Sequence, residues 1–198
     1  KIIETQRKED ALMALEKELS NKQRLLEDRE ARVSELEEII ARKDLAVKEL
    51  KQKIAQALRG FADKGLTVEE RDGKIYVSLE AKLLFASGST AVEPEGKTAI
   101  VQLAKAIESE TDLEIIVEGH TDTDALSSKS HPKDNWELSV LRATSVVNIM
   151  TANSAINPMI LTAAGRSEYH PVDEFDKAKN RRIEVIIAPN LDELFKMI

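Results

Sequence analysis

The sequence predicts an α+β fold, in which a mixed sheet of about four strands has helices packed on one face and follows a long N-terminal coiled-coil helix. Two patterns lead to this fold class. The first third of the chain has a seven-residue apolar repeat, and the remainder alternates strand-like with helix-like segments. A content of 33% charged and 4% aromatic residues is typical of a chain that is partly exposed helix. We therefore divide the chain into a helical spacer at 1–62, a folded domain at 66–190 and a short C-terminal helix at 191–198.

The helical spacer has apolar residues at a strict seven-residue step. They are Leu12, Leu19, Leu26, Val33, Ile40, Val47, Ile54 and Phe61. This repeat predicts a homo-oligomer, a dimer or a trimer, that associates through residues 5–61. A parallel dimer fits the aliphatic side chains best. The second set of core positions, three residues after the first, includes the cations Lys22, Arg29 and Lys43, which weaken the seam and leave an antiparallel pair open. The other interpretations are a solvated lone helix and a helix that packs back on the domain.

Strand signals begin where the repeat stops, at Gly65, which suits the end of a helix. Strand-like runs lie at 66–70, 74–79, 113–119, 159–167 and 180–188. Asp72 and Gly73 separate the first two runs, and this dipeptide is typical of a tight turn between antiparallel strands. The domain therefore starts with a hairpin.

Two helices are predicted between these strands. The first begins near Pro94, a residue suited to the first turn of a helix. Its apolar side chains share one face and are Ile100, Leu103, Ala104 and Ile107. The second helix is predicted over 134–151, where Asp134 and Glu137 have the spacing of a capping box. Its core face consists of Ser139, Ala143, Val146 and Met150.

Charge and composition exclude several classes of partner and site. The net charge of −7 disfavours binding to duplex nucleic acid and to an anionic membrane surface. The absence of cysteine rules out disulfides, thiolate catalysis and cysteine metal sites. The sequence has no run of 18 apolar residues that could span a bilayer. Because Lys1 already lies in a helical pattern, we expect an upstream signal, membrane anchor or lipid anchor in the longer protein.

The candidate ligand site combines a carboxylate at a strand end with polar residues on the second helix. Asp122 follows the strand-like run 113–119 in the segment EGHTDTD. On the helix, Asn135 and Arg142 lie two turns apart on a stripe that flanks the core face. A carboxylate and a guanidinium at one cleft suit a zwitterion, whose ammonium and carboxylate they would hold. The competing interpretation is an internal Asp122–Arg142 salt bridge.

A metal site or a catalytic centre is the main rival to a ligand clamp. His120, Asp122, Asp124 and His131 are the possible metal ligands, but their spacing matches no recognised zinc pattern. His120 fits a structural residue at a strand end, and His131 fits a loop. No nucleophile elbow is present either. We therefore expect neither an enzyme nor a cofactor.

The remaining charged residues of the strands are assigned structural roles. One of Arg181 and Arg182 is expected to point to solvent and the other to a structural carboxylate. Arg166 is given no ligand role. Glu114 and Glu118 alternate with apolar residues and are interpreted as the polar face of a strand.

The domain resembles the OmpA-like peptidoglycan-binding family. The similar blocks occur in the family's order at 83–107, 118–122, 135–150, 161–172 and 180–185. Together they cover residues 66–188, and the combination of NxxLSxxRAxxV with NRR makes the resemblance specific. NWELS, with the long loop at 123–134, is similar to the flagellar-motor stator subdivision of the family.

The resemblance implies noncovalent binding of the diaminopimelate stem residue of peptidoglycan. Asp122 matches the family aspartate that holds its ammonium, and Arg142 matches the arginine that holds its carboxylate. Asn135 would line the pocket, and backbone groups near Thr123 and Leu138 would complete it. The family often has an acidic residue where this chain has Ala86, which removes one expected polar contact.

The resemblance also implies a place and a role for the protein. It would lie in the periplasm of a Gram-negative bacterium and anchor the outer membrane or an envelope complex to the cell wall. Two domains joined by the coiled coil would grip the polymer by avidity. The alternative is an envelope scaffold whose coiled coil recruits a partner and whose domain has lost ligand binding. In that case Asp122 and Arg142 would satisfy each other, with no pocket between them.

Overall fold

The computed structural model describes residues 2–126, 130–192 and 196. By its internal contacts the chain forms two units. One comprises residues 1–43 with 191–198, and the other is a compact domain at 44–190. Within the described residues, no helix is long and apolar enough to cross a membrane. Most of the expected C-terminal helix at 191–198 lies outside the described residues.

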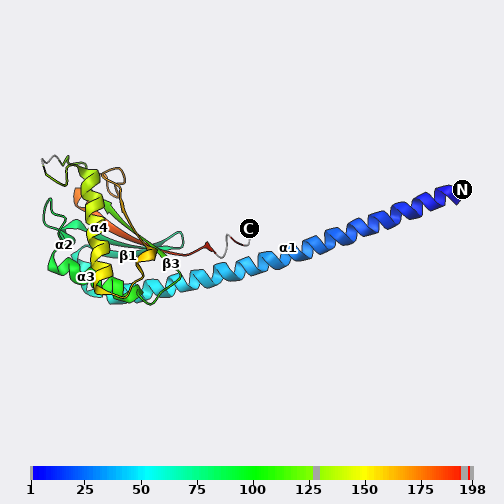
Figure 1. The fold of residues 1–198 in the computed structure, drawn as a ribbon, viewed down its shortest axis with the longest axis horizontal. Coiled ribbons are helices and arrows are strands. Elements are labelled where there is room, and N and C mark those ends of the chain that lie inside the picture. The colour runs from blue at the N-terminus through cyan, green and yellow to red at the C-terminus, as the bar shows by residue number, and fades with distance from the viewer. Residues whose placement is uncertain (1, 127–129, 193–195, 197–198) are drawn as a thin grey trace. The chain divides into compact units, whose positions relative to one another are not determined.

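The N-terminal helix α1 spans Ile2–Ala57 and is blue to cyan in Figure 1. It forms because the segment lacks glycine and proline and is rich in strong helix formers. Pairs four residues apart, such as Lys22 with Glu18 at 2.7 Å, add a little support. In the first unit the heptad residues are exposed, Leu26 by 58%. This part of the repeat is therefore not used for packing within one chain.

The last heptads of the spacer have a different role from the first. Val47, Ile54 and Phe61 are buried in the hydrophobic core of the compact domain. Phe61 lies beyond α1, in the 3₁₀ helix η1 (Arg59–Lys64). The expectation that the oligomer seam extends to Phe61 is therefore wrong for these three residues, because the domain covers them. The C-terminal end of the helix, which belongs to the compact unit, packs in the core of the domain.

The α+β prediction is confirmed, and the sheet has five strands rather than about four, because each of the five strand-like runs forms one. The strands are β1 (Leu66–Arg71), β2 (Lys74–Glu80), β3 (Leu113–His120), β4 (Leu161–Gly165) and β5 (Arg182–Pro189). They form a five-stranded sheet in the order β1-β2-β5-β3-β4. Only β3 and β4 run parallel to each other, and the other neighbours are antiparallel. Asp72 (φ 51°) and Gly73 (φ 69°) form the expected hairpin turn between β1 and β2.

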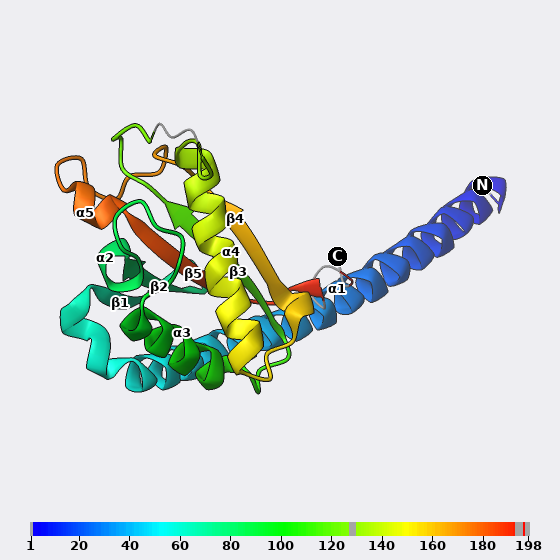
Figure 2. The same ribbon diagram turned by 60° about the vertical axis from the view of Figure 1, so that its left-hand side comes forward.

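The helices of the domain cover one face of this sheet, as the sequence predicts (Figure 2). They are α2 (Ala81–Leu84), α3 (Pro94–Ile107) and α4 (Asn135–Asn153). The domain also has two other short elements, α5 (Lys177–Asn180) and the 3₁₀ turn η2 (Pro158–Ile160). The expected core faces of α3 and α4 are buried; at most 1% of any of these eight side chains is exposed. Together with β2, β3 and β5 and the end of α1 they form one continuous core.

The opposite face of the sheet has charged pairs at the end of β3 where His120 lies, and it also has apolar residues, Ile116 and Ile186. Arg182 donates from Nε to Glu184 at 2.7 Å, and Glu118 forms an ion pair with Arg166. These pairs match the expectation that one of the two consecutive arginines meets a structural carboxylate and that Glu118 lies on a polar strand face. His120 is buried on this face near His170, with 6.5 Å between the ring centroids. His120 therefore lies at a strand end, where the sequence places it, and its side chain is buried away from the Asp122 pocket.

Candidate functional site

Asp122 is held in a tight turn immediately after β3. The Thr121 N–H donates to the Ser167 carbonyl at 2.9 Å, which ties the start of the turn to the segment after β4. The Asp124 N–H donates to Asp122 Oδ1 at 2.9 Å, the Asx-turn contact that aspartate favours. The Asp122 carboxylate is buried, with 7% of the side chain exposed. This loop therefore presents a buried carboxylate at the end of the sheet.

Close packing of α4 on the sheet fixes the second half of the site. A Cβ at Gly119 would lie 2.0 Å from the Ser139 carbonyl oxygen, and one at Gly165 would lie 2.5 Å from Ser139 Oγ. Only glycine at both positions lets the helix approach β3 and β4 this closely. The helix starts where Asp134 accepts a hydrogen bond from the Glu137 N–H at 2.8 Å. These contacts fix the position of the first two turns of α4 relative to the Asp122 loop.

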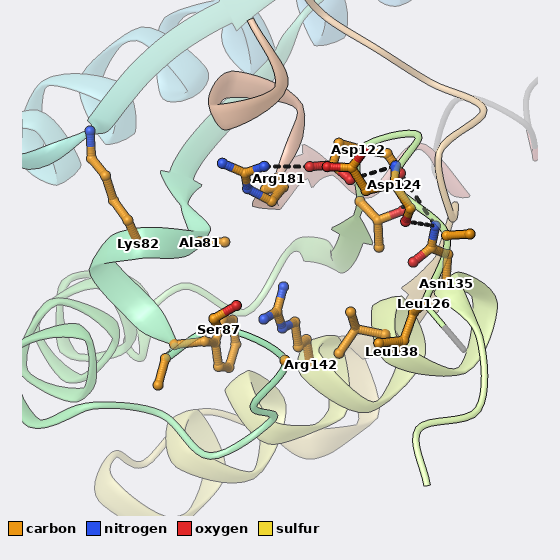
Figure 3. Close-up of a pocket in the computed structure, with 15 residues that line it drawn as sticks. Ala81, Lys82, Ser87, Asp122, Asp124, Leu126, Asn135, Leu138, Arg142 and Arg181 are labelled. Atoms are coloured by element: carbon orange, nitrogen blue, oxygen red, sulfur yellow. Dashed lines mark hydrogen bonds and ion pairs between the residues drawn. The ribbon is translucent and has the colours of Figure 1, made fainter. Parts of the chain in front are cut away.

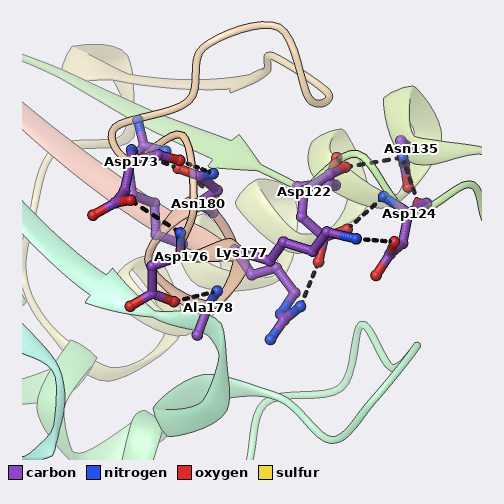
Figure 4. A network of polar contacts seen from close by, with 11 residues as sticks. Asp122, Asp124, Asn135, Asp173, Asp176, Lys177, Ala178 and Asn180 are labelled. Carbon is purple, nitrogen blue, oxygen red and sulfur yellow. Dashed lines mark hydrogen bonds and ion pairs between the residues drawn. The ribbon is translucent and has the colours of Figure 1, made fainter.

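Asn135 joins the first turn of α4 to that loop. Its Nδ2 donates to the Asp122 carbonyl at 3.3 Å and to the Asp124 carbonyl at 3.0 Å (Figure 4). Lys177 holds the Asp124 carboxylate from the other side at 2.5 Å, and this contact raises the pKa of Lys177. Asn135 therefore lies at the site as predicted, and its amide group positions the loop.

Arg142 is held in place by contacts that leave one end of its guanidinium directed into the cavity. Its Nε donates to the Ser89 carbonyl at 2.9 Å, and the guanidinium lies over the Phe85 ring at 4.7 Å. Burial and the nearby Arg181 lower the pKa of Arg142 to about 10. The group is therefore still charged at neutral pH. In Figure 3 it points into the cavity, toward Asp122 and Arg181.

These groups surround a pocket of about 500 Å³. Four of the five predicted site residues line it, namely Asp122, Asn135, Leu138 and Arg142. Thr123 is not among the described lining residues, and its side chain is exposed next to the pocket. Ala86 lines the pocket, so the acidic group that the family often has would have faced this cavity. Four of the five residues that the sequence nominates therefore meet at one pocket.

The internal Asp122–Arg142 salt bridge is absent among the described residues. The Asp122 carboxylate instead pairs with the Arg181 guanidinium, which also lines the pocket. The expectation that one of Arg181 and Arg182 would point only to solvent is therefore wrong. The alternation of side chains along an extended chain could have predicted this contact. Because Arg182 faces the polar side of the sheet, the preceding residue Arg181 must face the helix side.

The possible metal ligands do not converge. His120 is on the polar face, His131 pairs with Glu137, and Asp124 pairs with Lys177. Across residues 2–126 and 130–192, no group of three or more histidine or acidic side chains could hold a metal ion. The arrangement instead brings carboxylates and guanidinium groups together in one pocket.

The structure is an α+β domain with a charged pocket at one end of its sheet. The chain belongs to the OmpA family, whose family model matches residues 84–184. It is 29% identical to Motility protein B of Bacillus subtilis over 119 residues, which cover 58% of this chain and 45% of that protein. It thus spans about half the length of the curated relatives it matches.

Solved structures agree with this family assignment. The cell wall anchor of the T6SS from Pseudomonas aeruginosa is 27% identical with a TM-score of 0.61, over 69% of this chain and 97% of that chain. The periplasmic domain of Helicobacter pylori MotB is also 27% identical, with a TM-score of 0.62, over 69% of this chain and 88% of that chain. Both structural matches cover a larger share of this chain than the family model does.

Proposed function

We propose that this protein binds peptidoglycan noncovalently and anchors an envelope complex or the outer membrane to the cell wall. Membership of the OmpA family supports this role, as does the similarity to a structure described as a cell wall anchor. A periplasmic location follows the same reasoning, since a relative of known structure is a periplasmic domain. Catalysis is not part of the proposal.

The ligand group that the pocket suits best is the zwitterionic end of diaminopimelate. The observation that carries this proposal is that Asp122 and Arg142 face one cavity without pairing with each other. Asp122 would accept hydrogen bonds from the ammonium, and Arg142 would donate to the carboxylate. Arg142 is suited to this task because Ser89 and Phe85 already fix its side chain, so that little rotamer freedom is lost on binding.

The other predicted residues have supporting roles in this proposal. Asn135 holds the Asp122 loop in position. Leu138 forms an apolar wall, because its N–H already donates to the Asp134 carbonyl at 2.9 Å within the helix. The backbone at Thr123 is the remaining polar contact near the ammonium. Ala86 leaves open space where an acidic side chain would have added a further ligand contact.

The helical spacer would link two or three such domains. The exposed heptad residues from Leu12 to Ile40 form the seam of this proposed homo-oligomer. Several pockets that hold one repeating polymer gain avidity, so that weak binding at each pocket suffices for attachment. In this arrangement the spacer reaches only to residue 43, and residues 44–190 form the wall-binding domain.

The scaffold alternative is not favoured by the geometry. It requires Asp122 and Arg142 to satisfy each other with no pocket between them. In the described residues both side chains line a cavity of about 500 Å³, and they have different partners. We therefore retain ligand binding as the proposed function.

Co-sedimentation with purified diaminopimelate-type sacculi tests the proposal. Wild type should appear in the pellet, and Asp122→Asn and Arg142→Met should each weaken binding about tenfold or more, as expected for loss of a charge-assisted contact. The matched controls are Asp63→Asn and Arg59→Met, which make the same changes at exposed positions of η1. Circular dichroism should show that all five proteins are folded. Wild-type protein that stays in the supernatant would refute the proposal.

A further inference from the structure

An internal cation, Arg181, lies in the pocket at the place where the ligand's ammonium is expected. The Arg181 guanidinium forms an ion pair with the Asp122 carboxylate through Nη1 and Oδ2 (Figure 3). The two partners differ in exposure, because 44% of the Arg181 side chain is exposed but only 7% of that of Asp122. The Asp122 carboxylate is therefore fixed, whereas the Arg181 guanidinium can move out into solvent.

We infer that Arg181 is a specificity-determining residue that competes with the ligand's ammonium for Asp122. This inference rests on the proposed function, since it concerns how that ligand enters the same pocket. Binding exchanges one cation for another at a buried carboxylate. In the free protein Arg181 keeps Asp122 from being an unpaired buried charge, which would be costly.

The exchange needs only a rotation of the Arg181 side chain. The main chain at this residue is tied at both polar groups: its N–H donates to the Lys177 carbonyl at 3.1 Å, and its carbonyl accepts from the Ala81 N–H at 2.7 Å. Neither contact uses the guanidinium. A long, half-exposed side chain on a fixed backbone can therefore leave Asp122 without disturbing β5 or α2.

The second pocket cation does not have this freedom. Arg142 is buried against Phe85 and bonded to Ser89. The charge of Arg181 helps to lower its pKa, which means that the two guanidinium groups repel each other. A ligand carboxylate between them and a ligand ammonium at Asp122 would relieve this repulsion. A ligand that carries both groups gains from both changes, whereas a simple amine only replaces Arg181.

Competition by Arg181 limits the affinity of each pocket. Each ammonium that binds must first break an intramolecular ion pair, so that part of its interaction with Asp122 is offset. Weak, exchangeable binding at each pocket suits a protein that attaches to a repeating polymer through several linked domains.

The test compares two soluble probes that differ only in their amino groups, meso-diaminopimelate and pimelate. Their binding to the full chain is measured by isothermal titration calorimetry at neutral pH. In Arg181→Gln, diaminopimelate should bind about tenfold tighter than in wild type, because no cation competes for Asp122. Pimelate has no ammonium to gain from the change, so its affinity should stay the same or fall. Arg181→Lys keeps a cation, so its affinity for diaminopimelate should lie between those of wild type and Arg181→Gln.

Lys82→Gln is the matched control for the loss of one positive charge at the pocket. Lys82 also lines the cavity, but its ammonium pairs with Glu80 at 2.7 Å. This variant should change the binding of both probes by the same small factor. Diaminopimelate binding that weakens or stays unchanged in Arg181→Gln would overturn the inference and leave the proposed function standing. If wild type and all variants fail to bind diaminopimelate and sacculi, the proposed function itself fails, and the inference with it.

Discussion

The close approach of α4 to the sheet makes a strong prediction about Gly119. In Gly119→Ala the new Cβ would lie 2.0 Å from the Ser139 carbonyl oxygen and 2.8 Å from its carbon. Real Cβ atoms essentially never come closer than 3.0 Å to such neighbours, so strand and helix must separate by at least 1.0 Å. No flexible side chain can absorb this shift, because both sides of the contact are main chain.

The expected cost follows from this overlap. Overpacking of a well-packed interior costs about 1–3 kcal/mol, and a contact between two main-chain segments belongs at the upper end of that range. A loss of about 3 kcal/mol corresponds to a fall in Tm of roughly 6–12 °C for a domain of this size. The same shift would move Arg142 away from Asp122 by more than a preorganised site tolerates, which is about 0.5 Å.

Two assays check the prediction. Urea denaturation gives the loss of stability, and titration with diaminopimelate, at a temperature where the variant is folded, gives the loss of binding. The matched control is Gly60→Ala, since a Cβ there meets no atom of the described residues within 4 Å. If Gly119→Ala matched Gly60→Ala in both assays, the contact between α4 and β3 would not be what sets the site.

Two further predictions concern the helical spacer and the buried histidine. Ile54→Ala should destabilise the domain by about 2–5 kcal/mol, because Ile54 is fully buried in its core. Leu26→Ala changes an exposed residue at the same heptad position. It should leave urea denaturation of the domain unchanged and lower only the oligomer mass in analytical ultracentrifugation. If Leu26→Ala destabilised the domain and Ile54→Ala lowered only the oligomer mass, our division of the repeat would be wrong. Burial and the charges of Arg182, His170 and Arg166 lower the pKa of His120 from 6.5 to about 3. Between these two pH values the unfolded state binds more protons than the folded state, so the stability of the domain falls as the pH drops from 6.5 toward 3. When the pH is lowered from 7.5 to 4.5, the free energy of unfolding from urea denaturation should therefore fall by about 2–3 kcal/mol less in His120→Gln than in wild type. An equal fall in the two proteins would refute the lowered pKa of His120.

The sequence predicts features that depend on local spacing. The core faces of α3 and α4 and the Asp72-Gly73 turn follow from helical periodicity and from the backbone preferences of two residues, and all are found as expected. The same periodicity misleads in the spacer. A seven-residue repeat indicates a continuous apolar stripe, but it does not say what covers that stripe. Val47, Ile54 and Phe61 continue the pattern of Leu26 without a break and are nevertheless covered by the domain.

The partner of Asp122 could not be read from local spacing, because the order of the strands in the sheet decides it. β5 lies between β2 and β3, and its register pairs Arg182 with His120. Continued by one residue, this register brings Arg181 opposite Thr121 and so beside Asp122. Alternation along β5 gives the direction in which Arg181 points, but only the non-local strand order gives its neighbour.

The two charged halves of the pocket therefore depend on different parts of the fold. The pairing of β3 with β5 sets the position of Asp122 relative to Arg181. The packing of α4 against Gly119 and Gly165 sets the position of Arg142. A substitution that lifts α4 should accordingly displace Arg142 while the Asp122–Arg181 pair persists. Such a pocket would lose its hold on the ligand's carboxylate while the internal cation still competes with the ligand's ammonium, so its affinity would fall below that of wild type.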